Sequence, residues 1–128
     1  MSKLTISIIQ ANLHWENIDA NLQMFSLKLN ELNAKTDLII LPEMFTTGFS
    51  MNAENMAEEM EGKTMNWLKR QAAEKQAVIS GSFIAKDKGK YYNRLIGCAL
   101  MEVLNPMTKD IFLRSPKNMK LIHKALKN

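Results

Sequence analysis

The residue of this chain that is best placed to do chemistry is Glu43. It follows an apolar run, Leu38-Ile39-Ile40-Leu41, which is stopped by Pro42. Such a run is typical of a buried strand. A carboxylate directly after a buried strand lies at the carboxyl-terminal edge of the sheet, where α/β proteins build their sites. The sequence therefore makes Glu43 a candidate general base.

The sequence neighbours of Glu43 bear on what its carboxylate can do. Met44, Phe45 and Phe49 would supply apolar surroundings, which disfavour the charged form of a carboxylate, as a general base working near neutral pH requires. The alternative is an ordinary solvated loop glutamate. Position alone favours this alternative, because surface glutamates are common.

Other residues that could react or bind ligands fall into no catalytic pattern. Cys98 lies in an apolar run, so we expect an inert, buried or half-buried thiol. His14 and His123 have no metal-ligand spacing, and the chain has no glycine-rich phosphate loop. No metal or other cofactor is therefore indicated. We interpret Trp15 and Trp67 as packing residues.

The elements that must position Glu43 follow from hydrophobic periodicity. Apolar β-branched runs predict strands at residues 4–10, 37–41, 77–83 and 91–96, the last two separated by a turn at 86–90. Apolar residues at three- and four-residue spacing predict two helices, one capped by Asn17 or Asp19 and one over 62–76. Strands alternating with helices predict an α/β fold with sequential, parallel strand neighbours. The expected inward residues are Leu22, Phe25, Leu29 and Leu32 in the first helix, and Met65, Leu68 and Ala72 in the second.

Length and composition fit one globular domain. The chain has 128 residues, 46% of them hydrophobic and 23% charged. No apolar run approaches the roughly 18–20 residues that a membrane span needs, so we expect no membrane partner. The single cysteine permits no internal disulfide and favours a reducing, cytoplasmic location.

The net charge of +4 lies entirely in the last part of the chain. Residues 1–96 hold 11 Lys/Arg and 11 Asp/Glu, whereas residues 97–128 hold 6 Lys/Arg and 2 acidic residues. This basic tail has no interleaved aromatic residues and no nucleic-acid motif, so we expect no nucleic-acid partner. Residues 118–128 could form a small basic helix. The change in composition near residue 97 divides the chain into two parts.

Several motifs in the first part resemble one family. LPEMFTTGFSM, which contains Glu43, is similar to a signature of the nitrilase superfamily of carbon–nitrogen hydrolases, in particular its omega-amidase branch. The segments IIQANLHWENIDANL, AVISGSF and YYNRL match that branch in the same order. The resemblance covers residues 4–96 almost continuously. It identifies residues 1–96 as the N-terminal part of a carbon–nitrogen hydrolase domain.

The resemblance implies a fold and a reaction for the intact family. The fold is a four-layer αββα sandwich that commonly forms homo-oligomers, so this chain would be a truncated sandwich. The activity is deamination of 2-oxo acid amides such as 2-oxoglutaramate, by a glutamate base, a lysine that stabilises the oxyanion and a cysteine nucleophile. Only the glutamate carries over, to Glu43. The family's lysine motif, a Tyr-Asp-Lys-Arg-His-Leu-Phe-like run, and its cysteine in a Cys-Tyr-Asp-like context are missing from this sequence.

The genetic code offers a reason for the divergent tail. Codons for Met107 to Leu113, read one base earlier, permit Tyr-Asp-Lys-Arg-His-Leu-Phe, with the aspartate obligatory. The same offset lets Gly97 to Val103 read as Trp-Met-Arg-Pro-Asp-Gly-Ser, a plausible hairpin turn. It also lets Lys117 to Ala125 read as Glu-Glu-His-Glu-Ala-Tyr-Thr-Gln-Gly. Our hypothesis is that residues 97–128 are a frameshifted translation that ends at an out-of-frame stop.

Three functional interpretations stay open at this point. The leading one is an omega-amidase lineage whose present chain is inactive alone. The second is a non-catalytic remnant, or a small α/β interaction module whose basic tail contacts a partner. The third is a small flavodoxin-like ligand-binding domain, which the missing phosphate loop makes the weakest of the three.

Overall fold

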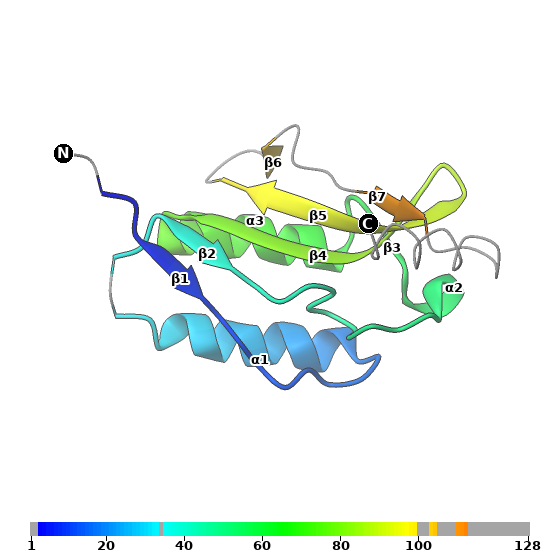
Figure 1. Ribbon diagram of the computed structural model, residues 1–128, viewed down its shortest axis with the longest axis horizontal. Helices are drawn as coiled ribbons and strands as arrows, with labels where there is room; N and C mark the ends of the chain where they lie inside the picture. The colour runs from blue at the N-terminus through cyan, green and yellow to red at the C-terminus, as the bar shows by residue number, and fades with distance from the viewer. Residues whose placement is uncertain (1–2, 34, 100–102, 105–109, 113–128) are drawn as a thin grey trace, which may run out of the picture.

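A computed structural model describes residues 3–33, 35–99, 103–104 and 110–112 of the chain (Figure 1). Its helices and strands alternate through most of the molecule, as the periodicity predicts. In chain order they are β1 (Ile6–Ile8), α1 (Ile18–Asn30), β2 (Leu38–Ile40), α2 (Ala53–Met56), β3 (Glu58–Glu59), α3 (Lys63–Lys75), β4 (Val78–Asp87), β5 (Lys90–Cys98), β6 (Val103–Leu104) and β7 (Asp110–Phe112).

Helix α1 begins where the sequence predicts. The Asn17 side chain accepts a hydrogen bond from the backbone N–H of Ala20 at 3.1 Å, which satisfies one of the free donors of the first turn. Leu22, Phe25 and Leu29 are buried, so the predicted apolar stripe faces the core. The helix ends at Asn30, and Leu32 packs against the core from beyond the helix end.

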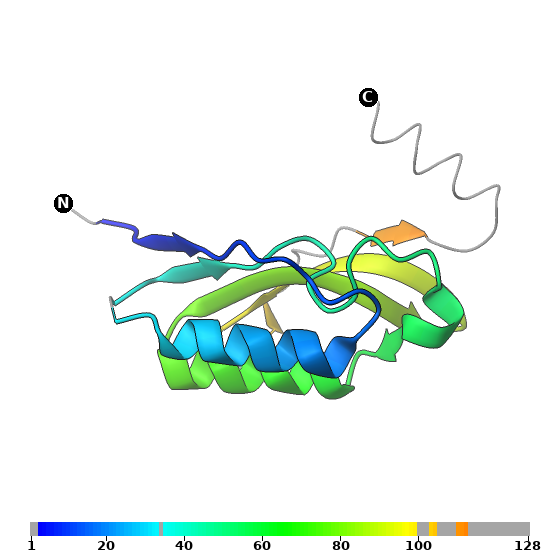
Figure 2. The same cartoon turned by 90° about the horizontal axis from the view of Figure 1, so that it is seen from below.

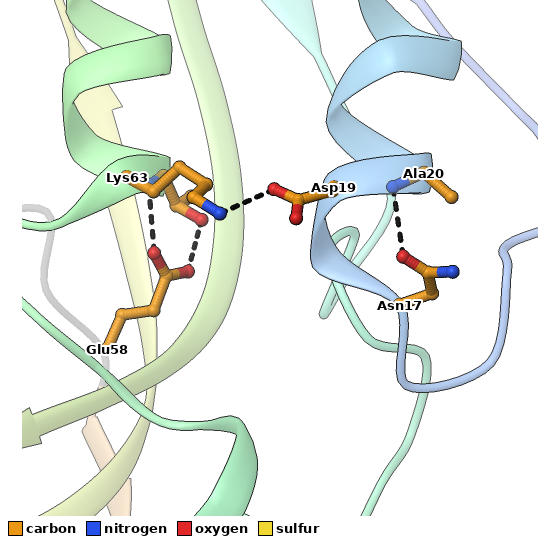
Figure 3. Close-up of polar contacts among 6 residues, drawn as sticks. Asn17, Asp19, Ala20, Glu58 and Lys63 are labelled. Carbon is orange, nitrogen blue, oxygen red and sulfur yellow. Dashed lines mark hydrogen bonds and ion pairs between the residues drawn. The ribbon is translucent and has the colours of Figure 1, made fainter.

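Helix α3 begins with a cap that the sequence did not reveal. Gly62 has no side chain to cap the first turn. Instead, the Glu58 carboxylate of β3 accepts hydrogen bonds from the Thr64 backbone N–H, at 3.0 Å, and from the Thr64 hydroxyl. Figure 3 shows Glu58 beneath this turn and Lys63 reaching across to Asp19 of α1, at 2.6 Å. The Asp19 carboxylate raises the pKa of the Lys63 ammonium through a hydrogen bond and charge attraction.

The sheet is parallel on one side and antiparallel on the other. Strands β1, β2 and β4 lie side by side and parallel, as expected. The prediction of parallel neighbours is wrong for the next pair, because β4 and β5 form an antiparallel hairpin in register from Ile79↔Cys98 to Asp87↔Lys90. Lys88 and Gly89 both have positive φ, at 51° and 76°, which is the geometry of a two-residue hairpin turn with the twist of its strands.

Several elements differ from the predicted ranges. The predicted strands at 77–83 and 91–96 are longer in the structure, because the hairpin continues the pairing to Asp87 and Cys98. Helix α2 and strand β3 were not predicted, and both are very short. Strands β6 and β7, which come from the part of the chain after residue 97, both pair with β5. The helix expected at 118–128 lies outside the described residues.

Helices α1 and α3 cover the same face of the sheet (Figure 2). Between them and the sheet lies the main core, in which the Phe45 ring contacts Phe25 edge-on, with centroids 5.6 Å apart, and Trp67 at 5.8 Å. The Trp67 indole N–H donates to the Ser26 hydroxyl at 2.8 Å, which joins the two helices. Trp67 is therefore the packing residue that was expected. Trp15 is not, since it is 63% exposed and only lies over Gly48.

On the opposite face of the sheet, the described helices cover one end only, where Ala53 and Met56 of α2 pack against Ile84 and Tyr91. Alternation along β1 puts Ile6 and Ile8 on the side away from buried Ile39 of β2, in register with Leu38 and Ile40. Ile6 and Ile8 are 46% and 67% exposed. The described residues thus form one helical layer and one sheet, the arrangement expected of the N-terminal part of an αββα sandwich. No described helix is long and apolar enough to cross a membrane.

Candidate active site

Glu43 lies in a turn just beyond β2, and the chain on both sides of it is fastened to β4. The Leu41 N–H donates to the Ser80 carbonyl at 2.8 Å, and the Phe45 N–H donates to the Ser82 carbonyl at 3.1 Å. The Met44 N–H donates to the Ser82 hydroxyl at 2.8 Å. The position of Glu43 at the carboxyl edge of the parallel strands is therefore fixed by backbone contacts with its neighbour strand.

The turn after Glu43 has an uncommon backbone conformation. Met44 has φ of 48°, in the left-handed region that residues with a side chain seldom adopt, at a cost of about 1–3 kcal/mol. The Met44 carbonyl accepts hydrogen bonds from the N–H groups of Thr47, at 3.2 Å, and Gly48, at 2.9 Å. These bonds hold the chain in a tight reversal directly after the candidate base.

Close packing beneath the turn anchors it to the core. Phe45 is fully buried, and a Cβ added at Gly81 of β4 would lie 2.9 Å from its ring. Glycine at position 81 therefore leaves the room that this ring needs. The buried Asn21 of α1 holds the next part of the loop, because its amide donates to the Thr46 carbonyl and to the His14 carbonyl, both at 2.7 Å.

The Glu43 side chain is exposed, and the apolar shell expected around it does not form. Met44 and Phe45 point into two separate buried clusters, and Phe49 is 67% exposed. One specific contact nevertheless separates Glu43 from an ordinary loop glutamate. The Asn93 side-chain amide of β5 donates to Glu43 Oε1 at 2.9 Å.

Glu43 lines a cleft of about 290 Å³ on the sheet face opposite α1 and α3. Ile40 and Ser80 are register partners on this face, and so are Ser82 and Leu95 across the hairpin. The cleft combines hydroxyl, amide and carboxylate groups with an apolar floor, as a small polar substrate would require. Its lining residues are Ile40, Leu41, Glu43, Ser80, Ser82, Asn93 and Leu95.

Neither a lysine nor a cysteine is among the lining residues that the structure describes. Cys98 is fully buried in the core on the helix-covered face, next to its register partner Ile79. Burial raises the pKa of the Cys98 thiol, which nearby Lys69 offsets only in part. A buried or half-buried thiol was predicted, and the structure confirms that Cys98 is buried. His123 lies outside the described residues, and the backbone of His14 is bonded to Asn21.

Sequence reasoning missed the residues that hold the site together. Asn21, Ser82 and Asn93 are polar residues at buried positions of a helix or strand. Asparagine is depleted in strand interiors, so Asn93 within YYNRL was an available signal. The sequence around Asn93 does not reveal its hydrogen-bond partner, because Glu43 lies 50 residues earlier in the chain.

Sequence comparisons find proteins that are similar to most of this chain. A family model described as carbon-nitrogen hydrolase matches residues 5–100. The chain is 38% identical over 97 residues to an omega-amidase, YafV, of Yersinia enterocolitica, covering 75% of this chain and 37% of that protein. It is 25% identical over 95 residues to a 2-oxoglutaramate amidase of Bacillus subtilis, covering 73% and 37%. The chain thus spans little more than a third of the length of these curated relatives.

Solved structures agree with this placement. A CN-hydrolase superfamily protein from Xanthomonas campestris, solved with an arsenic adduct in its active site, superposes with a TM-score of 0.77 at 31% identity. The match covers 97% of this chain and 45% of that chain. An N-terminal amidase with a TM-score of 0.67 and 20% identity, covering 91% and 29%, is similar in fold alone. The likeness to the first of these confirms the predicted fold class.

Proposed function

The chain belongs to the carbon–nitrogen hydrolase family, and on this premise we propose that it is the N-terminal part of an omega-amidase in which Glu43 is the general base. The observation that carries the proposal is the family's glutamate loop, held at the edge of an open cleft with its carboxylate bonded to Asn93. The proposed substrates are the terminal amides of 2-oxo dicarboxylic acids, such as 2-oxoglutaramate. This substrate class is supported by the names of the relatives.

In the proposed reaction the Glu43 carboxylate removes the proton of a cysteine thiol. The thiolate sulfur bonds to the amide carbon, and a lysine ammonium stabilises the resulting oxyanion. The carbon–nitrogen bond then breaks, and the nitrogen takes up the proton and leaves as ammonia. Water, deprotonated by Glu43, hydrolyses the thioester, which releases the carboxylic acid and restores the thiol. Of the carboxylate, the thiol and the ammonium that this reaction needs, the cleft supplies the carboxylate.

We propose that the present chain is inactive alone, because its sequence has neither the family's lysine motif nor its cysteine motif. The proposed boundary lies at Ile96, with residues 97–128 translated in a shifted frame. Small-molecule amides are then substrates of the restored-frame protein, by which we mean the polypeptide that continues after Ile96 in the reading frame of the family. We further propose a homo-oligomeric, cytoplasmic enzyme without nucleic-acid or membrane partners.

The reading-frame proposal is tested on DNA. The nucleotide sequence from the codon for Arg94 onward is expected to encode Tyr-Asp-Lys-Arg-His-Leu-Phe one base earlier than the frame of Met107 to Leu113. The same frame should continue without a stop to a Cys-Tyr-Asp-like motif. A stop codon in that frame before the cysteine, or the absence of the lysine codon, would refute the proposal.

The activity is tested by comparing ammonia release from 2-oxoglutaramate by the 128-residue chain and by a restored-frame protein. Only the restored-frame protein should release ammonia from this substrate. Glu43→Gln should lower its kcat by about 10²–10⁴-fold, the usual contribution of a general base. Glu54→Gln, at an exposed position of α2, is the matched control and should leave kcat unchanged. Turnover by the unaltered 128-residue chain, or full activity of Glu43→Gln, would contradict the proposal.

A further inference from the structure

We propose that Asn93 is a positioning residue, whose amide orients the Glu43 carboxylate so that one oxygen is presented to the proton it removes. The inference rests on the proposed role of Glu43 as base. It begins from the location of Asn93, which lies near the middle of β5 and is only 6% exposed. Asparagine is disfavoured at such positions, so its presence there calls for a specific partner.

The geometry identifies that partner. Asn93 Nδ2 lies 2.9 Å from Glu43 Oε1, and only the amide nitrogen can donate to an ionised carboxylate. This requirement fixes the amide orientation. Asn93 Oδ1 is then buried with no hydrogen-bond partner among the described residues. A residue whose role was only structural would be expected to satisfy its buried acceptor as well.

The hydrogen bond from Asn93 holds the exposed Glu43 side chain in one conformation. Glutamate loses considerable rotamer freedom when it is held in one conformation, and an exposed glutamate samples many. A bond from a rigid, hairpin-paired strand removes that freedom before the substrate arrives, which is the basis of preorganised catalysis. A neutral amide does this without placing a further positive charge beside the base. No hydrogen bond to the other carboxylate oxygen, Oε2, is present among the described residues, so that oxygen is left to accept a proton.

The contact itself is tested by NMR on the 128-residue chain. The side-chain amide signals of Asn93, assigned by their absence in Asn93→Leu, should change position in Glu43→Gln, which replaces the carboxylate that accepts the hydrogen bond by a neutral amide. Asn66, an exposed asparagine of α3, serves as the control, and its signals should not respond to Glu43→Gln. Asn93 signals that are indifferent to Glu43→Gln would overturn the proposed contact.

The function of the contact is tested by kinetics in the restored-frame protein. Asn93→Leu keeps the branched shape of the side chain but removes the donor, and should lower kcat by about 10²-fold with KM changed less than about twofold, as expected from misplacement of a reacting group. The kcat values are compared per folded molecule, with the folded fraction of each variant taken from its urea unfolding curve, so that a loss of stability alone leaves kcat unchanged.

The outcomes separate this proposal from the one on which it rests. If Asn93→Leu keeps the kcat of the parent while Glu43→Gln is inactive, the role of Asn93 is refuted and that of Glu43 stands. If the restored protein shows no amidase activity, the proposed function fails, and the NMR comparison still decides whether Asn93 holds Glu43. Asn93→Gln, which retains a donor on a longer side chain, should recover part of the lost kcat.

Discussion

Cys98 and Glu43, the two residues whose types could take part in amide hydrolysis, have opposite surroundings. The Cys98 thiol is fully buried on the helix-covered face, whereas Glu43 is exposed at a cleft on the other face. The sheet therefore lies between them. The only cysteine of the chain cannot serve as the partner of this base without reversing the direction in which β5 presents its side chains.

Burial of the Cys98 thiol predicts a pH dependence of stability. Its pKa is raised in the folded chain, so above about pH 8.5 the unfolded chain loses a thiol proton that the folded chain retains. The stabilisation is fully present below that pH and is lost as pH rises through the folded pKa, with a limiting slope of about 1.4 kcal/mol per pH unit. The free energy of unfolding, measured in urea at pH 7 and 9.5, should fall more in the unaltered chain than in Cys98→Ala. Equal falls would show that the thiol titrates alike in both states.

At the scale of elements, the β4–β5 hairpin decides whether the candidate site exists. Its register places Asn93 opposite Ile84 and Leu95 opposite Ser82, which brings an amide from one strand to a carboxylate held by the other. A slip of one residue would turn Asn93 to the helix-covered face. The two turn residues that set this register, Lys88 and Gly89, are therefore part of the architecture of the site.

This turn can be tested by a matched pair of substitutions. Gly89 has φ of 76° and open space around it, so Gly89→Ala adds no clash and imposes only the cost of a left-handed alanine, about 1–2 kcal/mol. Lys88 has φ of 51°, and Lys88→Asn should stabilise the hairpin by a few tenths of a kcal/mol, because asparagine tolerates this conformation. Urea midpoints should therefore move in opposite directions. Movement in the same direction would argue against this turn geometry.

The sequence predicted those elements whose signals are local. The N-cap of α1, the apolar stripes of α1 and α3, and the strand that delivers Glu43 all follow from the spacing of neighbouring residues. The Glu58 cap of α3 spans six residues, and the antiparallel direction of β5 follows from the two-residue turn at Lys88 and Gly89, but each lies between elements and outside the periodicity of any one of them. The Asn93–Glu43 bond joins residues 50 positions apart, which no local pattern encodes. The sequence therefore predicted only one residue of the site.

At the scale of the whole molecule, the uncovered sheet face governs behaviour in solution. Leu4, Ile6 and Ile8 are 69%, 46% and 67% exposed, and Ile6 and Ile8 share one face of β1. Exposed apolar surface of this kind promotes association, and an open strand edge adds to the tendency. In the intact family the second sheet of the sandwich would cover such a face. We therefore expect the isolated chain to be marginally stable and prone to aggregation.

The expectation can be measured with a hydrophobic dye and light scattering. The 128-residue chain should bind 8-anilinonaphthalene-1-sulfonate, and Ile6→Thr combined with Ile8→Thr should lower both dye binding and scattering. Leu27→Gln is the matched control, since Leu27 is 59% exposed on α1, outside the sheet. If the control lowers both signals as much as the double variant, the uncovered sheet face is not their source.

The cleft at Glu43 and the exposed side chains of Ile6 and Ile8 lie on the same side of the sheet. Covering this side would therefore affect both the solubility of the chain and the access of substrate to Glu43. We expect a polypeptide that covers Ile6 and Ile8 also to close the cleft around Glu43. In a chain that lacks this covering we expect no amide hydrolysis, and we expect chaperones and proteases to recognise the exposed apolar surface.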